Sequence, residues 1–98
     1  MAHQEHITLS ILVPTIGRTA ELDMLLDSIQ KAMLHLPYEI IIIDQNPAEF
    51  LDEVLSKYQH VLPISHHLVA FKGLSKAKNY GVKVSKGDFI CFPDRSEE

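Results

Sequence analysis

The sequence contains one cysteine, no tryptophan and only four glycines. A single cysteine, Cys91, excludes a disulfide within the chain and is compatible with a reducing compartment. The 98 residues are enough to bury one hydrophobic core without such a link. Because Cys91 falls in the middle of an apolar, strand-like run, we expect a buried structural thiol in preference to a nucleophile.

Long apolar runs and several common motifs are also absent. No apolar run approaches the roughly 20 residues that cross a bilayer, and residues 1–6 are polar with no Lys or Arg, unlike a signal peptide. We therefore expect no transmembrane segment and a cytoplasmic location. The chain has no G-x-G-x-x-G, no G-x-x-x-x-G-K-[ST] and no G-x-S-x-G, so simple dinucleotide-binding, P-loop and hydrolase functions lose support.

Acidic residues are missing from one third of the chain. The net charge is −4, yet no Asp or Glu lies between Leu55 and Gly87, where six lysines occur. A locally basic segment in an acidic protein favours a compact anionic ligand over a long polyanion. The alternative is a solvated lysine face. Between Lys72 and Lys86, where five of these lysines lie, Tyr80 is the single aromatic residue, so a nucleic-acid partner is not expected.

Strand-like and helix-like patterns alternate along the whole chain. We expect strands over residues 7–13, 38–43, part of 61–70 and 88–92, and helices over residues 19–35, 47–58 and 74–85. Pro14 should stop the first strand, and Thr19 should cap the first helix. Asn46 is the expected cap of the second helix, with Pro47 at its first position and Glu49 at its third.

This βαβαβαβ order predicts a Rossmann-like three-layer α/β/α half-domain with a four-stranded, mainly parallel sheet, formed as a single domain by residues 1–98. Ligands of such sheets bind beyond the carboxyl ends of the strands. The segments expected at those ends are Pro14-Thr15, Asp44-Gln45-Asn46, Phe71-Lys72-Gly73 and Pro93-Asp94.

Several residues near these strand ends could bind a nucleotide. Asp44 could accept hydrogen bonds from a nucleobase or ribose, or it could cap the turn before Asn46. Arg18 could pair with an anion near the start of the first helix, or it could be a surface charge. Lysines beside the start of the third helix, with Asn79, make a reasonable diphosphate site.

The six histidines show no zinc-like spacing with Cys91. His66 and His67 should point to opposite faces of a strand, which makes a shared metal difficult. We expect all six histidines to have structural roles.

These landmarks together resemble the N-terminal half of family 2 glycosyltransferases with the GT-A fold. The resemblance rests on residues 11–18, 22–29, 38–44, 73–81 and 87–94, whose order and spacing are more specific than any one segment. It covers nearly the whole chain but only the half of the family's domain that binds a nucleotide diphosphate-sugar donor, such as a UDP-sugar.

The resemblance implies roles for individual residues. Pro14, Thr15, Arg18 and Asn79 would lie at the nucleotide-sugar site, and Thr15 would face the nucleoside. Asp44 would lie near the uracil or its equivalent, and Lys78 by the diphosphate. Asp94 would be the first carboxylate of the D-x-D element that holds Mg²⁺ or Mn²⁺. Here the chain departs from the family pattern, because Arg95 and Ser96 follow this Asp.

Two functions follow as expectations. The first is a glycosyltransferase-like donor-binding domain, truncated or naturally short, with weak nucleotide affinity and little or no activity alone, since the half that supplies the general base is absent. The second is a non-catalytic module that forms a homodimer through an exposed edge at the fourth strand. A generic nucleotide-binding α/β domain is a third.

Overall fold

A computed structural model describes residues 6–93. The strands are β1 (Leu9–Thr15), β2 (Tyr38–Asp44), β3 (Ile64–Leu68) and β4 (Phe89–Cys91), and the helices are α1 (Thr19–Ala32), α2 (Asp52–Tyr58) and α3 (Leu74–Val84). The expected alternation of strands and helices is confirmed.

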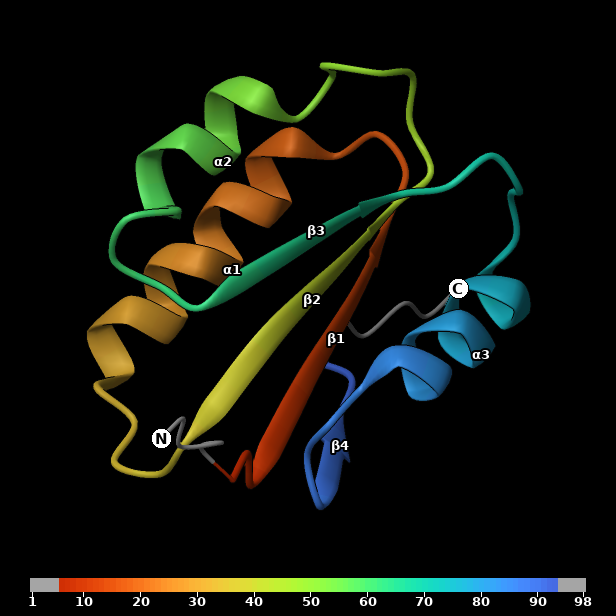
Figure 1. The fold of residues 1–98 in the computed structure, drawn as a ribbon. Helices are drawn as coiled ribbons and strands as arrows, with labels where there is room; N and C mark the ends of the chain where they lie inside the picture. The colour runs from red at the N-terminus through yellow and green to blue at the C-terminus, as the bar shows by residue number, and fades with distance from the viewer. Residues whose placement is uncertain (1–5, 94–98) are drawn as a thin grey trace, which may run out of the picture.

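The four strands form one parallel sheet in the order β3-β2-β1-β4. Helices α1 and α2 cover one face and α3 covers the other, so the α/β fold has three layers (Figure 1). After β1 the chain builds outward through β2 and β3, and then crosses back to place β4 on the other side of β1. The strand order therefore reverses beside β1.

Each face of the sheet has its own hydrophobic core. On the α1 and α2 side, alternate residues of β1 and β2 pack against the leucines and isoleucine of α1, together with the buried face of α2. On the other side, Leu12, Ile41 and Ile43 pack against Ala77 of α3. Strand β2 is thus buried on both faces, as its run of four isoleucines predicts for a central parallel strand. Cys91 is half-buried against the larger core.

The predicted helix boundaries were partly wrong. Thr19 is the first residue of α1 and does not cap it, because the cap position is Arg18 in a left-handed conformation. Helix α1 ends at Ala32, ahead of the predicted end, where Met33 turns left-handed. Helix α2 begins at Asp52, five residues later than expected from Pro47. Glu49 has a φ of 73°, which a right-handed helix cannot include.

Pro14 does not end the first strand. It pairs with Ile43 of β2 inside β1, which continues to Thr15. Strand β4 pairs with β1 only at residues 9–11. Pro14 therefore has a paired strand on one side only, where β2 lies. A proline without an N–H is tolerated there because no ladder bond to β4 is needed.

Hydrogen bonds at the amino end of the sheet join three elements. Ser10 Oγ donates to Glu39 Oε2 over 2.6 Å, and the Gly87 N–H donates to Ser10 Oγ over 2.8 Å. The Lys86 N–H donates to the same Glu39 oxygen over 2.7 Å. These bonds hold the turn between α3 and β4 tightly against β1 and β2.

A polar cluster joins α2 to α1. Tyr58 donates a hydrogen bond to Asp23 Oδ1, and Lys57 Nζ lies 2.5 Å from Asp23 Oδ2. The hydrogen bonds from Lys57 and Tyr58 lower the pKa of Asp23. The hydrogen bond to Asp23, followed by desolvation, raises the pKa of Tyr58 to about 12 from its ordinary value of 10.0.

Removing the Tyr58 hydroxyl should give a pH-dependent loss of stability. Because the folded-state pKa is raised, the stabilisation by Tyr58 is fully present below pH 10 and is lost as the pH rises toward 12. The free energy of unfolding of Tyr58→Phe should therefore lie below wild type at neutral pH and approach it in strong alkali. Asp23→Asn should show the same trend. A difference that stays constant across this alkaline range would contradict the assignment.

Candidate nucleotide site

A cavity of about 350 Å³ lies at the carboxyl end of β1. Its lining includes Pro14 and Thr15 from β1, Arg18 at the start of α1, Gly73 before α3 and Pro93 after β4. The volume is within the usual range for a small-molecule pocket. Three of the predicted site residues, Pro14, Thr15 and Arg18, therefore meet in one cavity.

The position of the cavity in the sheet is that of a ligand crevice. Strand order reverses beside β1, and ligands of open α/β sheets bind at such a switch point, outside the carboxyl ends of the strands. The lining residues come from segments that follow β1, β2, β3 and β4 in the chain. The fold thus gathers four connections around one space.

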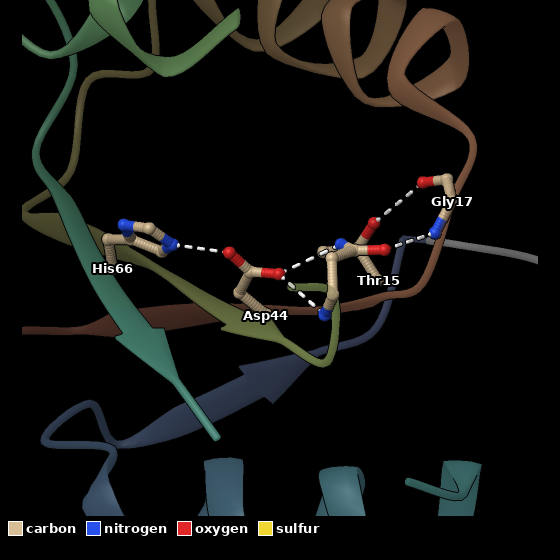
Figure 2. Close-up of polar contacts among 5 residues, drawn as sticks. Thr15, Gly17, Asp44 and His66 are labelled. Atoms are coloured by element: carbon tan, nitrogen blue, oxygen red, sulfur yellow. Dashed lines mark hydrogen bonds and ion pairs between the residues drawn. The ribbon is translucent and has the colours of Figure 1, made fainter. Parts of the chain in front are cut away.

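Asp44, at the end of β2, is fully buried and lies outside the cavity lining. Its Oδ1 accepts hydrogen bonds from the Asn46 backbone N–H over 2.9 Å and from Asn46 Nδ2 over 2.8 Å. Its Oδ2 lies 2.7 Å from Nε2 of His66 on β3 (Figure 2). The carboxylate caps the turn before Asn46, as one of the two sequence interpretations proposed, and pairs with a histidine as well.

Asn46 extends this network to the first loop. Its Oδ1 accepts a hydrogen bond from the Gly17 N–H over 2.6 Å, and Gly17 has a φ of 65°, a conformation that favours glycine. Thr15 Oγ1 lies 3.4 Å from the Gly17 carbonyl oxygen (Figure 2). The polar groups at the ends of β2 and β3 therefore fix the loop that forms one wall of the cavity.

His66 and His67 point to opposite faces of β3, as predicted. His66 reaches Asp44 on the face covered by α1 and α2, whereas Nδ1 of His67 lies 2.8 Å from the Tyr80 hydroxyl of α3. The pairing of His66 with Asp44 was not predicted. Because side chains alternate between the faces of a strand, Asp44 of β2 and His66 of β3 could be expected on either the same face or opposite faces of the sheet. The observed register of β2 against β3 puts both side chains on the same face and next to each other.

Lys78 and Asn79 lie on α3 and do not line the cavity. Lys78 is half-buried, and its Nζ lies 5.0 Å from the centre of the Phe92 ring, a cation–π distance. Asn79 is exposed. Lys78 is thus directed toward the segment that follows β4 and leads to Asp94, which lies outside the described residues.

The described residues do not provide a divalent-metal site. Between residues 6 and 93, no group of three or more His, Cys, Asp or Glu side chains could hold a metal ion. Mg²⁺ and Mn²⁺ need several oxygen ligands in defined geometry. Asp94, the one predicted metal ligand, lies outside the described residues. None of the helices described between residues 6 and 93 has the length and apolar character of a membrane span.

Comparison with known proteins supports the resemblance. The family described as "Glycosyl transferase family 2" matches residues 10–95. The chain is 33% identical over 92 residues to a hyaluronan synthase and 29% identical over 92 residues to a chondroitin synthase, both of Pasteurella multocida. It is 31% identical over 87 residues to an uncharacterized glycosyltransferase of Haemophilus influenzae.

These alignments cover most of this chain but a small part of each relative. They include 92%, 92% and 88% of the chain, and 10%, 10% and 28% of the respective relatives. The family match spans nearly all of β1 through β4, including every strand end that surrounds the cavity. The chain belongs to glycosyl transferase family 2 and forms part of its α/β domain.

Proposed function

We propose that this chain is a donor-binding domain of a glycosyltransferase and that the cavity beside β1 receives a nucleotide diphosphate-sugar. The observation that carries the proposal is the place of the cavity, at the reversal of strand order in a sheet that belongs to this family. A nucleotide needs a concave, partly apolar site with a few polar groups. The lining supplies both kinds, with Val13, Leu22 and Leu25 beside Thr15 and Arg18.

Two cations in or near the cavity suit a diphosphate, and one carboxylate, that of Glu21, also lies in the cavity wall. Arg18 lies in its wall, and Lys78 lies on the neighbouring helix with its ammonium beside Phe92. Phosphate oxygens form strong charge-assisted hydrogen bonds with such cations. We propose that Arg18 and Lys78 neutralise the diphosphate while Thr15 contacts the nucleoside, with Pro14 and Asn79 beside them. Asp44 would act indirectly, because it accepts hydrogen bonds from Asn46, and Asn46 in turn holds Gly17 in place.

Transfer itself is expected to be weak or absent in these 98 residues alone. The reaction would displace the nucleoside diphosphate at the anomeric carbon of the donor sugar, and a general base must reach the acceptor hydroxyl. We propose that this base comes from a part of the family's domain outside residues 6–93. The matched region makes up 10% of each synthase and 28% of the Haemophilus protein, and the activities of the synthases belong to those whole proteins.

Replacing Lys78 by alanine should weaken UDP binding by about tenfold or more, because a hydrogen bond between charged groups contributes about 1.5–3 kcal/mol. Isothermal titration calorimetry with UDP at low ionic strength would measure this. Lys83→Ala is the matched control, since Lys83 is an exposed lysine in the last turn of the same helix. Equal affinities of wild type and Lys78→Ala would contradict the role given to Lys78.

Self-association is a second candidate function. In the described part of the chain, β4 is an edge strand that pairs only with β1, and Phe89 on it is 66% exposed. Unpaired edges with exposed apolar side chains can pair with another chain. We propose a homodimer through β4 as the alternative, tested by size-exclusion chromatography with light scattering. A monomer at the highest attainable concentration would count against it.

A further inference from the structure

Strand β4 stops pairing with β1 well before β1 itself ends. The paired register ends at Ile11 and Cys91, whereas β1 continues beside β2 to Thr15. The Phe89 N–H donates to the Thr8 carbonyl over 2.9 Å. In a parallel ladder, each further donor of a strand toward the same partner comes two residues along the chain. The next donors of β4 are therefore Cys91 and the residue two places beyond it.

The next ladder positions are prolines on both strands. Two places beyond the last paired residue of β4 comes Pro93, which has no N–H to donate to the Leu12 carbonyl. On β1, the Thr15 carbonyl accepts the Gln45 N–H on the β2 side. Because the backbone groups of successive residues point to opposite sides of a strand, those of Pro14 face the β4 side. The following bond would need the Pro14 nitrogen as its donor, and this nitrogen also carries no hydrogen.

The cavity beside β1 begins where this pairing ends. Both prolines line it, together with Leu22 and Leu74. Leu22 belongs to α1, on one face of the sheet, and Leu74 to α3, on the other face (Figure 1). Paired strands lie about 4.8 Å apart, so a cavity that touches elements on both faces crosses the layer that a strand paired with β1 would occupy. The end of the ladder therefore leaves this space open.

We propose that Pro93 is a positioning residue that keeps β4 from pairing with β1 past Ile11 and thereby holds the nucleotide cavity open. Its effect on ligand binding rests on the proposed function, whereas its effect on strand pairing does not. The ring of Phe92, the residue before it, has its centre 5.0 Å from Lys78 Nζ. The segment that leaves the ladder is thus also the neighbour of a cation proposed for the diphosphate. An N–H at position 93 would let the ladder advance and the cavity narrow.

The test restores the missing donor with two side chains of different size. Pro93→Ala and Pro93→Val both supply an N–H at this position; valine keeps a bulk similar to that of proline, and alanine is smaller. Amide hydrogen exchange followed by NMR measures whether the new N–H is hydrogen-bonded. An NMR titration with UDP measures affinity, and the Tm reports whether the fold is kept. Pro47→Ala is the matched control, because Pro47 is an exposed proline outside the cavity lining.

The inference predicts that in both variants the amide of residue 93 exchanges at least about tenfold more slowly than an exposed amide. UDP affinity should fall by about three- to tenfold in both, because the ligand would have to separate the newly paired strand. Pro47→Ala should bind UDP as wild type does. Fast exchange of the new amide in either variant would overturn the inference. So would a loss of affinity in one variant only, since the side chain and not the N–H would then be its cause.

Failure of the inference and failure of the proposed function give different results. If wild type binds UDP and both variants match it, the role of Pro93 in holding the cavity open is wrong and the proposed function stands. If wild type does not bind UDP at millimolar concentration, the proposed function fails. The exchange rate at residue 93 then still decides whether Pro93 ends the ladder.

Discussion

Replacing Asp44 by alanine is expected to lower the free energy of unfolding by about 3 kcal/mol or more. The carboxylate is fully buried and receives two hydrogen bonds from Asn46 and one contact from His66. Alanine would leave these partners without an acceptor in a buried setting, where each unsatisfied polar group costs about 1–3 kcal/mol. The change would also release Asn46 from Gly17. Urea denaturation followed by circular dichroism would measure the loss.

Asp44→Asn is the matched control because its shape and one oxygen are kept. The side-chain oxygen can still accept both bonds from Asn46, and the new amino group can donate to Nε2 of neutral His66. Asp44→Asn should therefore retain most of the stability that Asp44→Ala loses. If alanine were tolerated as well as asparagine, the network in Figure 2 would not hold the strand ends together. The asparagine variant is also the right one for ligand titration, since it is expected to stay folded.

Gly87→Ala is expected to be among the most destabilising small changes in the chain. A Cβ at this position would lie 2.7 Å from the Ser10 backbone nitrogen and from Ser10 Oγ, and 2.9 Å from the Leu9 carbonyl carbon. Two of these atoms belong to the backbone of β1 and cannot rotate away. Overpacking of this kind costs about 1–3 kcal/mol, and we expect the upper part of that range. The shift would also break the hydrogen bond from Gly87 to Ser10.

Gly17→Ala provides the comparison for Gly87→Ala. Apart from the two chain neighbours, no described atom lies within 4 Å of a Cβ at Gly17, so the cost of Gly17→Ala comes from the left-handed φ of 65°, which is about 1–2 kcal/mol. Gly87→Ala should therefore show the larger loss in the same denaturation experiment. A smaller loss for Gly87→Ala than for Gly17→Ala would mean that the turn before β4 is not tightly packed against β1.

The alternation of elements could be predicted because each strand and helix carries its own pattern. The four isoleucines of β2 and the helical spacing of Leu22, Leu26 and Ile29 are signals within single elements, and the structure follows them. In one place a contact with a distant part of the chain decided the structure against the local sequence pattern. Asn46 has every local feature of a helix cap, yet its side chain binds Gly17 and Asp44, and α2 starts at Asp52.

The candidate site was partly predictable for a related reason. Pro14, Thr15 and Arg18 are adjacent in the chain and follow one strand, so their shared place in the cavity follows from the position of that strand end. The contacts of Gln45 with Gly73 and of Asp44 with His66 span 28 and 22 residues. They depend on the register between β2 and β3 and on the path into α3, which no local pattern specifies.

The most direct test of the central claim is an amide NMR titration of the wild-type chain with UDP and a UDP-sugar, repeated with Mg²⁺. The account predicts saturable shifts that cluster around the cavity beside β1, at the amides of Thr15, Arg18, Gln45 and Gly73. Shifts that do not saturate, or that lie at the opposite end of the sheet around Ser10 and Gly87, would contradict a nucleotide site there. Unchanged spectra at millimolar nucleotide would contradict it as well, and would favour the self-association function.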